Sequence, residues 1–80
     1  MGAVRLTEVA AHQWYVIDHI AESDPRVRKR MLAMGFVPGQ SIKIKMTSGL
    51  FGRPKLVVDV GTARYALLYS EAEHVYVRKI

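Results

Sequence analysis

The segment D-P-R-V-R-K-R-M-L-A-M-G-F-V-P-G, which begins at Asp24, contains the start and stop signals of one short helix. Asp24 suits the N-cap because its carboxylate accepts hydrogen bonds from amides of the first turn, and Pro25 suits the first helical position. Gly35 can take the left-handed conformation that ends a helix, and Pro38 prevents the helix from continuing. The segment therefore predicts a helix that ends near Met34.

The two faces of this helix differ in chemistry. The apolar face has the spacing of residues that pack on a core, and it consists of Val27, Met31 and Met34, widened by Leu32 and Phe36. The opposite face is cationic and consists of Arg26, Lys29 and Arg30, with Arg28 at its flank. No acidic residue is spaced to neutralise these charges within the helix. The cationic face is therefore either a solvated surface or a docking face for an acidic partner.

Alternation of apolar and polar residues predicts five short strands around the helix. They are expected at residues 14–20, 40–46, 55–60, 64–69 and 75–79. The second strand has the cleanest alternation, which places Met46 with the inward residues Ile42 and Ile44. In the first strand the sequence does not show which alternate residues face the core. Either both faces of the strand are partly covered or the strand contains a bulge.

Short helical turns are expected at residues 6–9 and at Ser70, whose spacing from Glu73 is that of a capping box. Structural turn positions are assigned to Gly35, Pro38, Gly39 and Gly61. Five strands, with one short α-helix between strands 1 and 2, predict a mainly β fold. Its expected form is an antiparallel barrel that closes on itself and leaves no free sheet edge.

Length and composition limit the classes of protein. A chain of 80 residues is expected to form a single small domain over residues 1–80. The absence of cysteine excludes disulfides and thiolate metal sites, and it suits a reducing compartment. The apolar runs are too short to span a bilayer, and the N-terminus lacks a signal-peptide pattern. A net charge of +5 permits an anionic partner, whether nucleic acid, a lipid surface or an acidic protein.

No constellation of residues points to catalysis. The acidic residues are scattered singly, and there is neither a nucleophile with its base nor a glycine-rich phosphate loop. His12, His19 and His74 do not have the spacing of a compact metal site. In a regular strand, moreover, Asp18 and His19 point to opposite faces. We therefore expect no enzymatic activity, no cofactor and no metal site.

Two other features favour binding. Lys43 and Lys45 share one side of a strand, and Trp14 or Tyr76 could stack on bases, as in small barrels that bind nucleic acid. The other feature is an apolar pair in a glycine-flanked loop, Leu50 and Phe51. This pair either folds over an open barrel end or forms a hydrophobic hook for a partner or for self-association.

Several segments together resemble the FeoA family, ferrous iron transport protein A. The segment R-M-L-A-M-G-F-V-P-G, from Arg30 to Gly39, resembles the family stretch R-L-L-x-x-G-[apolar]-x-P-G. The segment L-T-E-V at residues 6–9 is similar to the L-[ST]-x-L opening, and P-K-L-V-V-D-V-G at residues 54–61 is similar to the third strand. The closing segments Y-A-L, E-A and V-Y-V also look like the end of the family pattern.

The resemblance implies an SH3-like barrel and a soluble cytoplasmic accessory protein without activity of its own. The implied partner is the membrane GTPase that transports ferrous iron, ferrous iron transport protein B. We expect the partner to contact Arg26, Lys29, Arg30, Leu50 and Phe51, and self-association stays open. The alternatives are a small basic barrel that binds nucleic acid and a stand-alone relative of the C-terminal domain of iron-dependent repressors, which the barrel also resembles.

Overall fold

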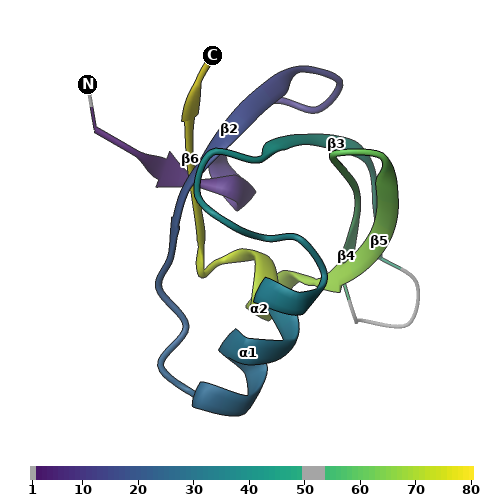
Figure 1. The fold of residues 1–80 in the computed structure, drawn as a ribbon. Helices are drawn as coiled ribbons and strands as arrows, with labels where there is room; N and C mark the ends of the chain where they lie inside the picture. The colour runs from purple at the N-terminus through teal and green to yellow at the C-terminus, as the bar shows by residue number, and fades with distance from the viewer. Residues whose placement is uncertain (1, 50–53) are drawn as a thin grey trace.

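The structure is a computed structural model that describes residues 2–49 and 54–80. Six antiparallel strands form one sheet in the order β1-β6-β2-β3-β4-β5 (Figure 1). The strands are β1 (Val4–Arg5), β2 (Trp14–Ile20), β3 (Ser41–Ser48), β4 (Lys55–Val60), β5 (Ala63–Leu68) and β6 (Val75–Lys79). The helical segments are the 3-10 turn η1 (Leu6–Glu8), α1 (Pro25–Ala33) and α2 (Tyr69–Ala72). The fold is therefore mainly β, and the predicted strands are present close to their predicted bounds.

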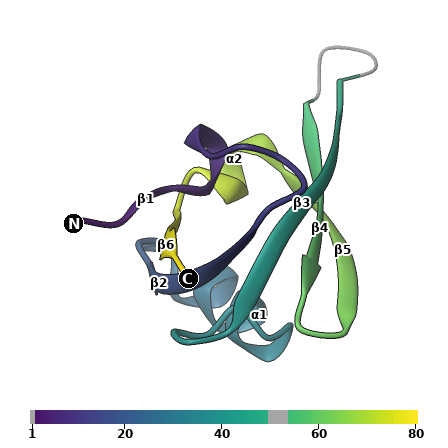
Figure 2. The same ribbon diagram turned by 90° about the horizontal axis from the view of Figure 1, so that it is seen from above.

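The prediction of a closed barrel of five strands is wrong in two respects. The two-residue β1 adds a sixth strand beside β6, so α1 follows the second strand of the chain rather than the first. In the part of the chain that the structure describes, no ladder joins β1 to β5, so the sheet is not closed. Instead, α2 contacts β5 and η1, and η1 contacts β6 (Figure 2). The opening is filled by Leu6 and Ala72, both 0% exposed, so side-chain packing replaces the missing ladder.

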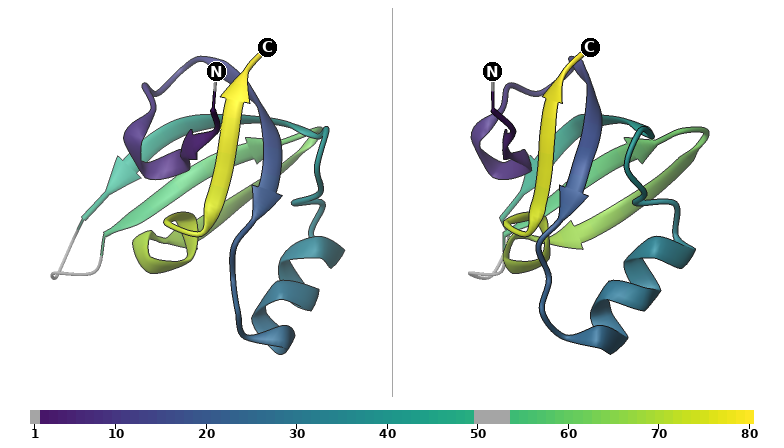
Figure 3. Two further views of the ribbon diagram at one scale, coloured as in Figure 1. Left: turned by 90° about the vertical axis from the view of Figure 1, so that its left-hand side faces the viewer. Right: turned by 60° about the vertical axis from the view of Figure 1, so that its left-hand side comes forward.

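The helix α1 is anchored to the core at its C-terminal end. Met31 is its buried residue, and Val27 and Met34 are half-buried. Phe36, just beyond the helix, is fully buried and holds the exit of α1. Leu32 is 40% exposed, so the prediction that it widens the apolar face is wrong. The helix consequently extends away from the sheet and presents most of its surface to solvent (Figure 3).

Two β-bulges decide which residues face the core. The pairing of β3 with β4 shifts between Ile44 and Met46, so Met46 is 56% exposed and its predicted inward position is wrong. The pairing of β2 with β6 shifts between Ile17 and His19, which is the bulge that the ambiguous phase of this strand allowed. As a result Ile17 and Ile20 are both buried, although they are three residues apart.

The core is apolar throughout the described residues, with no buried polar or charged side chain. None of the helices within residues 2–49 and 54–80 is long and apolar enough to cross a membrane. The groups that could carry recognition chemistry therefore lie on the surface of the sheet and on α1.

Candidate functional site

The N-terminal half of α1 carries positive charge that the helix itself does not compensate. Asp24 Oδ1 accepts a hydrogen bond from the amide of Arg26 at 2.9 Å, which caps the helix. Arg26, Arg28 and Lys29 are exposed. The ion pairs formed among residues 2–49 and 54–80 include none to Arg26 or Lys29. These two side chains are therefore available to a carboxylate from another molecule.

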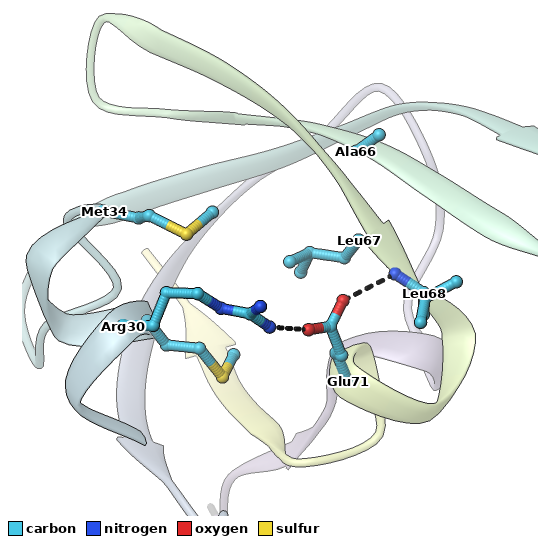
Figure 4. Close-up of a pocket in the computed structure, with 7 residues that line it drawn as sticks. Arg30, Met34, Ala66, Leu67, Leu68 and Glu71 are labelled. Atoms are coloured by element: carbon cyan, nitrogen blue, oxygen red, sulfur yellow. Dashed lines mark hydrogen bonds and ion pairs between the residues drawn. The ribbon is translucent and has the colours of Figure 1, made fainter. Parts of the chain in front are cut away.

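Arg30 differs from its neighbours because it forms an ion pair with Glu71 of α2 (Figure 4). The same carboxylate accepts a hydrogen bond from the amide of Leu68 at 2.9 Å. The Glu71 side chain is 18% exposed, whereas that of Arg30 is 59% exposed. The pattern within the helix predicted that Arg30 has no acidic partner. It could not reveal Glu71, which is 41 residues away in the chain. Glu71 thus links α1 to the end of β5.

A cleft of about 350 Å³ lies between α1 and the end of β5. It is lined by Arg30, Met31, Met34, Ala66, Leu67, Leu68 and Glu71. In Figure 4 the side chains of Met34 and Leu67 point into the opening, and the ion pair of Arg30 with Glu71 crosses it. An apolar lining beside a charged pair suits an apolar side chain that is flanked by polar or charged neighbours.

The glycines predicted at turns have positive φ angles. Gly35, Gly39 and Gly61 have φ values of 98°, 92° and 59°. At Gly35 this conformation ends α1, and at Gly61 it makes the turn between β4 and β5. Pro38 is exposed in the segment between α1 and β3. Leu50 and Phe51, the other predicted partner contacts, lie outside the described residues.

A second charged surface lies on the outer side of four neighbouring strands. The strand registers place Trp14, Lys43, Asp59 and Arg64 in one row, with one residue from each of β2, β3, β4 and β5. Lys43 Nζ lies 4.6 Å from the centre of the Trp14 ring, and Arg64 Nε lies 2.7 Å from Asp59 Oδ1. The hydrogen bond from Arg64 holds the pKa of Asp59 below its ordinary value of 3.8. The row therefore contains both signs of charge, and it shares no residue with the cleft.

The histidines do not converge with carboxylates on a metal site in the residues that the structure describes. His12 lies in a turn with a φ of 68°. His19 Nδ1 is 2.7 Å from Asp18 Oδ2, so these two side chains do not point to opposite faces as they would in a regular strand. The bulge of β2 brings them together. His74 makes a separate contact, with its Nε2 at 4.0 Å from Glu22 Oε1.

Comparison with known proteins identifies the family. The FeoA domain model matches residues 4–79. No curated protein matches the chain. Among solved structures, zinc-complexed FeoA from Stenotrophomonas maltophilia, a procaryotic SH3 domain protein, is 31% identical over 95% of this chain and 91% of its own, with a TM-score of 0.78. An iron uptake regulatory protein, FeoA, is 26% identical, with 100% of both chains covered and a TM-score of 0.77.

The same fold occurs in larger proteins. A manganese-dependent transcriptional repressor is 15% identical and has a TM-score of 0.84, with 98% of this chain and 42% of the repressor covered. At this identity the likeness concerns the fold alone. The FeoA domain model, by contrast, covers nearly the whole chain, and the FeoA structures share its SH3-like fold from end to end. The chain therefore belongs to the FeoA family.

Proposed function

We propose that this protein is a non-enzymatic accessory factor of ferrous iron uptake, which binds the membrane GTPase transporter of ferrous iron in the cytoplasm. Membership of the FeoA family supports the link to ferrous iron transport. The FeoA of Stenotrophomonas maltophilia is described as a candidate activating factor of that process. For this chain, the observation that carries the proposal is the cleft beside α1, which Arg30 borders, on the same helix as the exposed Arg26 and Lys29.

The residues proposed for partner contact have different roles. Arg26 and Lys29 are exposed and have no carboxylate partner in the described part of the chain, so we assign them to attraction of an acidic surface. Arg30 is already paired with Glu71, so we assign it to the border of the cleft. Leu50 and Phe51 stay in the proposal as an apolar contact, on the basis of the sequence.

Co-purification with the full-length transporter in detergent tests the proposal. The double variant Arg26→Glu and Lys29→Glu reverses both charges. It should bind the transporter about tenfold or more weakly than wild type, because two attractive contacts become repulsive. The matched control is the double variant Lys43→Glu and Lys45→Glu, which makes the same charge change on the outer side of the sheet. The control should bind as wild type does. Undiminished binding by the helix variant would reject the helix face, and no binding by wild type would reject the function.

One observation supports nucleic acid as a second candidate ligand. Trp14 is 42% exposed and its ring lies beside the ammonium group of Lys43, which is an arrangement that can stack on a base and pair with a phosphate. This alternative predicts the reverse result from the same variants, because Lys43→Glu with Lys45→Glu would abolish binding. It also predicts an affinity for single-stranded nucleic acid that falls steeply as salt increases. A gel shift titrated with salt measures this dependence.

A further inference from the structure

Within residues 2–49 and 54–80, the outer edge of β5 is a free edge of the sheet. In the strand order β5 is terminal and pairs with β4 alone among the described strands. We infer that this edge binds an extended, acidic segment of the partner by β-strand addition, with the cleft beside α1 receiving an apolar side chain of that segment. This inference rests on the proposed function and specifies how the partner is held.

The hydrogen-bond pattern shows which backbone groups of β5 face outward. In an antiparallel pair, residues that bond across the ladder alternate with residues that do not. The Tyr69 amide donates to the carbonyl of Pro54 at 3.0 Å, directly beyond the β4–β5 ladder. Counting back from Tyr69, every second residue of β5 is therefore bonded to β4. These residues are Leu67, Tyr65 and Ala63. Arg64 and Ala66 direct their N–H and C=O groups away from β4, toward the free edge.

The end of this edge is closed by a side chain. The amide of Leu68, the next outward-facing residue, donates to Glu71 Oε1 at 2.9 Å. The outward groups of Arg64 and Ala66 take no part in the backbone hydrogen bonds formed outside helices and strands in the described residues. An added strand can therefore form hydrogen bonds with Arg64 and Ala66 and must end near the Glu71 cap.

The opposite edge of the sheet is less suited to strand addition. It is formed by β1, which has two residues and turns directly into η1. Short edge strands limit pairing with other chains, whereas β5 extends over six residues. The asymmetry between the two edges favours β5 as the place for an additional strand.

The surroundings of the β5 edge specify the chemistry of the added segment. The cleft contains Ala66 and Leu67 on the strand side and Met31 and Met34 on the helix side, so an apolar side chain of the segment would lie between them. Within the cleft itself, Arg30 is already paired with Glu71. Arg26 and Lys29, which are exposed on the same helix and form no ion pair within the described residues, favour acidic residues in the part of the segment that lies along α1. A second copy of this chain would bring another α1 with the same positive charges, which makes it the poorer occupant.

A proline at Ala66 tests strand addition directly. Because the Ala66 amide faces the free edge, Ala66→Pro removes an outward donor and leaves the β4–β5 ladder intact. Its affinity for the full-length transporter in detergent should fall by about tenfold or more, since the donor is lost and the ring blocks the approaching strand. Ala66→Ser, which keeps the amide, is the matched control and should bind as wild type does.

A second measurement covers the case in which the proline variant does not fold. Hydrogen exchange of the wild-type amides, resolved to single residues, should slow by about tenfold or more at Arg64 and Ala66 when the transporter is bound. The amides of Tyr65 and Leu67, already bonded to β4, serve as internal controls. Binding that leaves the exchange of Arg64 and Ala66 unchanged overturns the inference.

The outcomes separate this inference from the proposed function. If wild type binds the transporter and a folded Ala66→Pro variant binds equally well, strand addition is wrong and the proposed function stands. If wild type does not bind, both fail. If sedimentation shows a dimer of the chain that Ala66→Pro dissociates, the edge serves self-association, and the inference of an acidic partner segment is wrong.

Discussion

The guanidinium of Arg30 on α1 is paired with the carboxylate of Glu71 on α2, which also accepts a hydrogen bond from the amide of Leu68. One carboxylate thus connects a protruding helix to the end of an edge strand. This arrangement sets one end of the cleft and limits the length of the free β5 edge. The stability of the fold and the shape of the candidate site therefore depend on the same residue.

The two contacts of Glu71 can be separated by substitution. Glu71→Ala removes both the ion pair and the hydrogen bond to Leu68, and we expect it to lower the free energy of unfolding by about 1–2 kcal/mol. Glu71→Gln keeps an oxygen for the Leu68 amide and loses the charge, so the decrease should be less than about 1 kcal/mol. Urea denaturation measures both values. Equal stability of the two variants would show that the hydrogen bond contributes nothing.

The faces of α1 differ in their contribution to stability. Met31 is 1% exposed, so Met31→Ala should lower the free energy of unfolding by about 2–4 kcal/mol. Leu32, the adjacent residue, is 40% exposed, so Leu32→Ala should change the free energy of unfolding by less than about 1 kcal/mol. Thermal and urea denaturation of the two variants provide the comparison. A larger effect at Leu32 would contradict the orientation of the helix.

Gly35 should be sensitive to a side chain because of its backbone conformation. Its φ is 98°, and a Cβ at this position would meet Val60 Cγ1 at an acceptable 3.8 Å. Backbone strain is then the main effect of Gly35→Ala, and we expect a loss of about 1–2 kcal/mol in the free energy of unfolding. Gly49→Ala is the control, because Gly49 has no positive φ and an added Cβ would meet no atom of the described residues within 4 Å. Similar stabilities for both variants would disprove the role of strain.

Asp59 makes the stability of the fold sensitive to acid. Its pKa lies below the ordinary value of 3.8 because Arg64 donates a hydrogen bond to the carboxylate. A lowered pKa means that the stabilisation is present above the unfolded-state pKa and is lost as pH falls through the folded-state pKa. Removing the charge with Asp59→Asn should reduce the loss of melting temperature below about pH 4. Melting curves measured from neutral pH into acid test this, and parallel curves for both proteins would contradict it.

Much of the fold followed from local sequence. The start of α1 is determined by Asp24 and Pro25, whose capping chemistry acts within one turn, and its end by Gly35, which supplies the left-handed residue. The strand β4 also has its predicted bounds, because its side chains alternate regularly between the core and solvent. The resemblance to the FeoA family could be recognised from the order of such short segments along the chain.

The tertiary structure decided the features that join distant residues. The exposed position of Met46 follows from the bulge where β3 pairs with β4. The sequence of β3 alone does not show how this strand is aligned with β4. The open sheet results from η1 and α2 packing between its edges, and the cleft from α1 meeting β5 across the Arg30–Glu71 pair. The sequence alone determined approximately where α1 and the five longer strands begin and end, because capping, turn conformation and alternation act over a few residues. Which edges stay free and which charges stay unpaired was decided only by packing between segments far apart in the chain.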